Sequence, residues 1–112
     1  MSETAAPDNE LLGDIEEAMR DVVDPELGIN VVDLGLVYEC AVIKNKDETR
    51  TVDIKMTLTA PGCGMGEILV QDVRDKVQIV PTVAHANVEL VFDPPWNYSM
   101  MSEEARLQTG MM

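Results

Sequence analysis

The spacing of hydrophobic residues along the chain predicts two helices. From Glu10 to Val22, apolar residues recur at three- and four-residue steps, which is the period of one buried helical face. The same period occurs from about Met65 to Gln78, and Pro81 prevents the helix from continuing. A short third helix is predicted to begin at about Ser102 and to end before Gly110, with acidic residues in its first turn.

Three strands are predicted, two of them from the alternation of apolar and polar residues. The clearest covers Thr51 to Thr59, where the apolar positions of one face are Val52, Ile54, Met56 and Leu58. A strand from about Leu36 to Lys44 precedes it, and the polar run at 45–49 is typical of a hairpin connection. The third strand is predicted from about Asn87 to Phe92.

The order helix, strand, strand, helix, strand predicts an α+β fold. We expect a two-layer sandwich in which a small mixed sheet carries the helices on one face. The second and third strands are joined through a helix, so they should run in the same direction. Residues 9–112 form one predicted domain, and the small and acidic residues 1–8 are expected to be a disordered tail.

This topology predicts that three loops meet at one edge of the sheet. The hairpin brings the start of the first strand beside the end of the second, and the parallel third strand ends at the same edge. The loops are 24–30, 59–66 and 93–97. Ligand sites of α/β proteins favour the carboxyl ends of strands. The candidate site residues at this edge are Asp24, Glu26, Thr59, Cys63 and Trp96.

Cys63 is the most informative of these residues. Gly62, Gly64 and Gly66 surround it, so the backbone can turn sharply and neighbouring side chains leave the sulfur unshielded. The following helix would place its positive end near the thiol, which lowers a cysteine pKa and favours a nucleophilic or metal-binding thiolate. The alternative is an ordinary strand-to-helix turn in which the cysteine is a small apolar filler.

Each neighbour of the thiol also has a purely structural interpretation. Asp24 can cap the turn at Pro25, Glu26 can be a solvated loop charge, and Trp96 can be a hydrophobic lid over a small core. Cys40 lies in the middle of a predicted strand, where packing is the better explanation. The only histidine, His85, is expected at the opposite edge, which disfavours a Cys–His catalytic pair.

Composition narrows the classes of function. The formal net charge is −13 with eight Lys and Arg residues, which disfavours nucleic acid as a partner, although the charge can simply serve solubility. No apolar run approaches the roughly 20 residues of a membrane span, and the N-terminus lacks the pattern of a signal peptide. The chain has two cysteines, too few for a disulfide framework, so a reducing cytoplasm is the expected location. No Cys-x-x-Cys motif is present, which disfavours a closed four-cysteine metal site within one chain.

Four separated motifs stand out in the chain: DPELGINVVDLGLVY at 24–38, MTLTAPGCGMG at 56–66, FDPPW at 92–96 and MMSEEARL at 100–107. Together they resemble the SufT-like iron–sulfur cluster assembly factors. The resemblance extends from about Leu11 to Met112. Many relatives have proline where this chain has Gly64, which changes the flexibility of the loop. The related PaaD branch carries further cysteines near its C-terminus, and their absence here disfavours that branch.

The resemblance implies a role in the maturation of iron–sulfur proteins. It implies that Cys63 is the reactive cysteine, Thr59 the loop threonine, and Asp24 and Glu26 the acidic pair of the family. The implied partners are proteins of the SUF assembly machinery and client apoproteins, and the implied cargo is iron or an iron–sulfur cluster that is bound transiently.

We therefore predict a non-enzymatic carrier in which Cys63 binds metal. Tetrahedral cluster iron takes four ligands and prefers thiolates, so one thiolate per chain requires a bridged site, either in a homodimer or with a partner protein. The alternative is a metal-free adaptor that recognises clients or scaffold proteins through its acidic surface. A thiol enzyme is the weakest hypothesis, because no base is predicted near Cys63.

Overall fold

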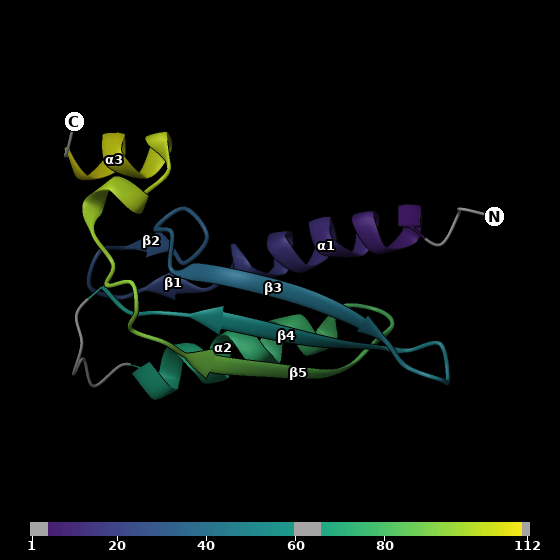
Figure 1. Ribbon diagram of the computed structural model, residues 1–112. Helices are drawn as coiled ribbons and strands as arrows, with labels where there is room; N and C mark the ends of the chain where they lie inside the picture. Colours follow the sequence, from purple (N-terminus) through teal and green to yellow (C-terminus); the bar gives the residue numbers. More distant parts are fainter. Residues whose placement is uncertain (1–4, 60–65, 111–112) are drawn as a thin grey trace.

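The chain forms a small α+β domain, as predicted. The computed structural model describes residues 5–59 and 66–110 (Figure 1). In chain order the elements are α1 (Ala5–Met19), β1 (Val23–Asp24), β2 (Ile29–Asn30), β3 (Val37–Lys44), β4 (Arg50–Met56), α2 (Gly66–Ile79), β5 (Val83–Leu90), a 3₁₀ helix (Tyr98–Met100) and α3 (Glu103–Thr109). None of the described helices combines the length and the apolar character needed to cross a membrane.

The main sheet has the mixed topology that the sequence predicts. Its strand order is β3-β4-β5, with β3 antiparallel and β5 parallel to the central strand. Val37 pairs with Met56 and Met56 pairs with Leu90, so the start of β3 and the ends of β4 and β5 share one edge. In Figure 1 the arrowheads of β4 and β5 point to the end of the molecule where β1, β2 and α3 lie.

Helices cover one face of this sheet and leave the other open. Val52 and Ile54 of β4 are almost completely buried in a core that includes Ile15 of α1 and Val73 of α2. Figure 1 shows α2 crossing behind β4 and β5. The opposite face is polar, with Asn87 donating a hydrogen bond to Asp53 Oδ1 at 2.9 Å. The result is a two-layer sandwich.

Several element boundaries differ from the predicted ones. Helix α1 begins at Ala5 rather than at Glu10, so residues 5–8, predicted as part of the tail, are helical. Strand β4 ends at Met56 rather than at Thr59. Strand β5 begins at Val83 rather than at Asn87, because its register against β4 already starts with the pair Val83 and Arg50.

The predicted loop between α1 and β3 contains a small hairpin. Strands β1 and β2 pair antiparallel, with Asp24 opposite Ile29. The turn between them closes through Gly28, whose φ of +70° is a left-handed conformation that favours glycine. A second glycine of this kind, Gly35, has a φ of +77°, and a Cβ there would collide with the carbonyl of Met100. The C-terminal segment therefore packs directly on the 31–36 loop.

Helix α3 lies between Ser102 and Gly110, as predicted, and both residues cap it. Ser102 Oγ accepts a hydrogen bond from Ala105 N at 3.1 Å, and Gly110 ends the helix in the left-handed conformation. The N–H of Ser102 donates to Asp33 O at 2.7 Å, which joins this helix to the loop after β2. Buried Met101 and Ala105 add apolar contacts to the same junction.

Candidate functional site

The predicted meeting of loops at one sheet edge is present in the described backbone. Thr57 N donates to Leu36 O at 2.8 Å, which continues the contact between the β3 and β4 segments beyond the paired strands. Val91 N donates to Met56 O at 2.8 Å, which does the same for β5. The loop before β3 therefore contacts the segment after β4, and the segment after β5 contacts the end of β4 itself.

Cys63 itself lies outside the described residues, but both flanks of its segment are described. Thr59 is half-buried after β4, and Gly66 is the buried first residue of α2. A Cβ at Gly66 would lie 3.0 Å from Leu58 Cδ1 and 3.5 Å from Leu90 Cδ1. The lack of a side chain at Gly66 thus lets α2 begin close against the ends of β4 and β5, and both described flanks of Cys63 lie at this edge.

Asp24 is held within the β1–β2 hairpin. Its side chain is 4% exposed, and Oδ1 accepts a hydrogen bond from Glu26 N at 2.7 Å. Asp24 O also accepts from Gly28 N at 2.7 Å. These contacts give Asp24 the turn-capping role that the residue before a proline often has. Glu26 is exposed at the tip of the same hairpin, where its carboxylate is accessible to a partner.

Trp96 is fixed at the same end of the molecule through its indole N–H. Nε1 donates to Leu34 O at 2.6 Å, and the ring packs against the hydrophobic core. Tyr98 contacts Trp96 edge to face at a centroid distance of 5.1 Å. The hydroxyl of Tyr38 donates to Pro94 O at 2.8 Å, which ties the start of this segment to β3. These contacts place Trp96 against the 31–36 loop.

A polar network that the sequence reasoning missed supports the 30–36 loop. Asp33 accepts hydrogen bonds from Asn30 Nδ2 at 3.0 Å and from Arg20 Nη1 at 2.8 Å. The hydrogen bond from Asn30, followed by the hydrogen bond and charge of Arg20, lowers the pKa of Asp33. The hydrogen bond to Asp33 raises the pKa of Arg20. The network joins the turn directly after α1 to the loop. No local sequence pattern predicts it, because Arg20 and Asp33 are 13 positions apart in the chain.

Alternation along the predicted strand assigned Thr57 to the wrong face. The predicted strand places it on the polar face, but its side chain is 1% exposed. Among the described residues, its hydroxyl Oγ1 has no hydrogen-bond partner. The strand ends at Met56, so the alternation of faces no longer governs the side chain that follows.

The other cysteine and the histidine lie away from the loop edge. Cys40 packs half-buried against the core, and burial, followed by the nearby charge of Glu16, raises the pKa of its thiol. His85 pairs with Thr51 near the hairpin end of β4, so it lies at the opposite edge, as predicted. Within residues 5–59 and 66–110, no three His, Cys, Asp or Glu side chains gather in a metal-binding arrangement.

Comparison with known proteins identifies the class to which this fold and site belong. Residues 13–90 match the family described as "Iron-sulfur cluster assembly protein". The chain belongs to this family, and the resemblance drawn from the sequence motifs is confirmed.

Individual relatives match the sequence of this chain over most of their length. The chain is 43% identical to a "Fe-S protein maturation auxiliary factor" of Porphyromonas gingivalis, covering 88% of this chain and 90% of that protein. It is 39% identical to the "Fe-S protein maturation auxiliary factor SufT" of Staphylococcus aureus, covering 80% and 98%. A solved DUF59 domain from Bacillus anthracis superimposes with a TM-score of 0.76 at 35% identity, covering 93% and 95% of the two chains.

Proposed function

We propose that this protein is an iron–sulfur maturation factor that carries iron or a cluster transiently on Cys63 to client apoproteins. Family membership supports the biological process. The observation that supports the site is the position of Thr59 and Gly66, which flank the cysteine segment, at the carboxyl edge of β4 and β5. Asp24, Glu26 and Trp96 surround this edge in the proposal. The protein acts as a carrier in the cytoplasm and catalyses no reaction of its own.

The chemistry of the cargo favours Cys63 over the other cysteine. Iron in clusters binds thiolates, so the ligand must lose its proton at neutral pH. The raised pKa of Cys40 opposes this, and Cys40 is half-buried against the core. Cys63 lies among three glycines before α2 in the sequence. A thiol near the positive end of a helix is more readily deprotonated.

A single Cys63 thiolate leaves most ligand positions of an iron centre to other molecules. In the proposal, the cargo is bridged between two copies of the chain or between the chain and an assembly protein of the SUF type. Delivery is then a ligand exchange without electron transfer. A client thiolate binds the iron, the bond from Cys63 to iron breaks, and the Cys63 thiolate is released.

Anaerobic reconstitution tests this proposal directly. The purified protein is incubated with ferrous iron and sulfide, and the visible absorbance and the native mass are measured. We expect a thiolate-to-iron absorption band that is lost in Cys63→Ser and kept in Cys40→Ser, which is the matched control. A native mass of two chains plus cargo supports the homodimeric bridge.

The opposite result has a defined meaning. If Cys63→Ser binds the same amount of iron and sulfide as the parent, Cys63 is not the ligand and the carrier proposal is wrong. A metal-free adaptor would then explain family membership better, with exposed carboxylates such as Glu26 contacting clients or scaffold proteins. The charge of −13 favours basic partner surfaces in that case.

A further inference from the structure

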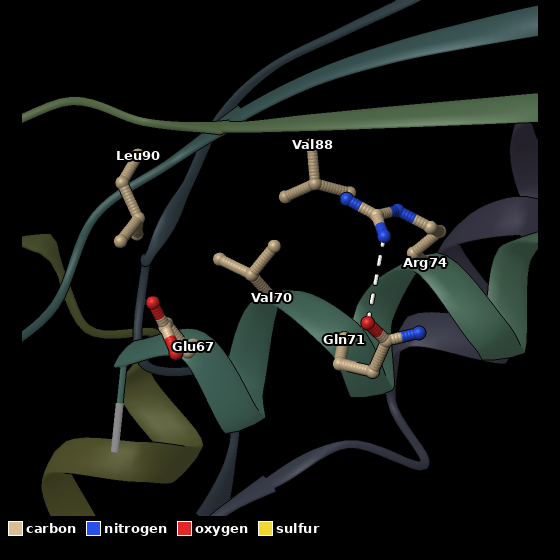
Figure 2. A pocket seen from close by; sticks show the side chains of 6 residues that line it. All are labelled: Glu67, Val70, Gln71, Arg74, Val88 and Leu90. Carbon is tan, nitrogen blue, oxygen red and sulfur yellow. Dashed lines mark hydrogen bonds between the residues drawn. The ribbon is translucent and has the colours of Figure 1, made fainter. Parts of the chain in front are cut away.

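A groove lies between α2 and β5, the edge strand at the opposite end of the strand order from β3. Its volume is about 340 Å³, and it is lined by Glu67, Val70, Gln71, Arg74, Val88 and Leu90. Figure 2 shows Val70 rising from α2 toward the strand that carries Val88 and Leu90. Three aliphatic side chains thus form the floor, and the polar side chains of α2 form one wall.

The other wall is an unpaired strand edge. Strand β5 has β4 as its only neighbour among the described strands. Val91 N donates to Met56 O, so the odd-numbered residues of this stretch direct their backbone groups toward β4. Successive residues of a strand alternate in direction, so the N–H and C=O groups of Val88 and Leu90 point away from β4. The same residues that line the groove therefore offer backbone donors and acceptors to an added strand.

Opposite charges mark the two ends of the groove. In Figure 2, Glu67 lies at the Leu90 end and Arg74 lies at the Val88 end. Their spacing along α2 is about 10.5 Å at the usual helical rise. In an extended chain, residues i and i+4 face the same side about 13 Å apart, with residue i+2 between them. Arg74 has one long hydrogen bond of 3.4 Å to Gln71 in this groove, so its charge is available to a ligand.

We propose that this groove binds an extended segment of a partner protein as an additional strand beside β5. The segment places an aliphatic side chain between Val70, Val88 and Leu90, a basic side chain toward Glu67 and an acidic side chain toward Arg74. Strand addition to an exposed edge beside a helix is a recurring mode of peptide recognition, in which the backbone supplies affinity and alternate side chains supply specificity.

A designed peptide tests the proposal. The probe is the acetylated and amidated peptide Thr-Lys-Thr-Val-Thr-Glu-Thr, titrated into isotope-labelled protein and followed by the amide NMR signals. We expect the signals of Val88 and Leu90 to shift and Glu67→Lys to weaken binding about fivefold, since an attraction becomes a repulsion. Glu89→Lys changes the same charge on the open face of β5 and serves as the matched control, with affinity unchanged.

Backbone methylation of the peptide separates strand addition from simple apolar binding. One peptide is N-methylated on Lys, Val and Glu, and a second on the alternating Thr residues. In an added strand, only one of these sets faces β5. One methylated peptide should therefore bind at least about tenfold more weakly than the parent, while the other binds normally.

Three results overturn the inference. They are equal behaviour of the two methylated peptides, the absence of shifts at β5, and β5 shifts that depend on protein concentration without peptide and accompany a dimer in sedimentation. The last result would make the groove a contact between copies of the chain. The test uses no iron, and Cys63→Ser should bind the peptide as the parent does, so its outcome is independent of the carrier proposal.

Discussion

Gly35→Ala tests how the C-terminal segment is held against the candidate site. The structure gives Gly35 a φ of +77° and places the Met100 carbonyl where an alanine Cβ would be. Gly28 provides a matched control, because its φ is +70° but no atom lies within 4 Å of the position that an alanine Cβ would take. The two substitutions share the backbone strain and differ in the collision.

The magnitudes follow from this difference. A left-handed conformation costs a residue with a Cβ about 1–2 kcal/mol, and loss of glycine freedom in the unfolded chain returns about 0.4–1 kcal/mol. Gly28→Ala should therefore lower the free energy of unfolding by about 1 kcal/mol. Gly35→Ala adds the displacement of a packed backbone carbonyl, which should cost a further ~1–3 kcal/mol, as overpacking typically does.

Urea unfolding measures the difference with a built-in reporter, since Trp96 is the only tryptophan and bonds to the loop that contains Gly35. At a slope of about 2 kcal/mol per molar urea, the midpoint of Gly35→Ala should lie at least about 0.5 M below that of Gly28→Ala. Equal midpoints, or a lower midpoint for Gly28→Ala, would refute the close packing of the 100–102 segment on Gly35.

Three further predictions follow from individual contacts. Cys63 should react with an alkylating reagent faster than Cys40 in the folded protein, because burial raises the pKa of Cys40. Equal rates of alkylation, measured by mass spectrometry, would count against a reactive Cys63. Trp96→Phe should lower the free energy of unfolding by about 1–2 kcal/mol, since Leu34 O loses its hydrogen-bond donor. The control Tyr98→Phe, at an exposed ring, should change it by less than about 0.5 kcal/mol, and similar losses for both variants in circular dichroism melts would contradict a stabilising hydrogen bond from Trp96. The pKa of Asp33 is lowered in the folded state, so its contribution to stability is present above the ordinary aspartate value of about 3.9 and is lost as the pH falls through the folded-state pKa. Asp33→Asn should therefore make the free energy of unfolding less dependent on pH in this acidic range. An unchanged acid unfolding curve would show that the network does not stabilise the fold.

The sequence predicted the order and direction of the main elements because their signals are local and periodic. Alternation at Val52, Ile54 and Met56 identifies a strand with one buried face, and the crossover through α2 makes β5 parallel to it. Together with the hairpin between β3 and β4, these two facts predict which loops meet at the carboxyl edge.

The boundaries were less predictable because neighbouring elements determine them. Residues 83–86 of β5 include Ala84, His85 and Ala86, which show little apolar alternation, and they form a strand because β4 provides hydrogen-bonding partners. Strands β1 and β2 have only two residues each, and their hairpin depends on the Asp24 turn and on Gly28. Propensity cannot predict such pairings without knowledge of the partner strand.

The meeting of loops at one edge of the sheet was predictable, and the contacts made there were not. Chain topology predicted that Trp96 lies at the carboxyl end of the sheet. Its hydrogen bond to Leu34 O was not predictable, because it joins two loops that are 62 positions apart in the chain. The Arg20–Asp33 pair likewise joins residues 13 positions apart in the chain, which only the folded structure brings together. The role of Cys63 remains a prediction from its sequence context and its family.

Maturation of a client enzyme in cells tests the central claim most directly. Cells that lack this gene are supplied with the parent chain, Cys63→Ser or Cys40→Ser, and the activity of an iron–sulfur enzyme is measured at equal levels of its polypeptide. Cys63→Ser should alter the free energy of unfolding by less than about 1 kcal/mol, so a defect would reflect chemistry and not folding. The carrier proposal predicts restored activity with the parent and Cys40→Ser but not with Cys63→Ser. Full restoration by Cys63→Ser would contradict a carrier that works through this thiolate.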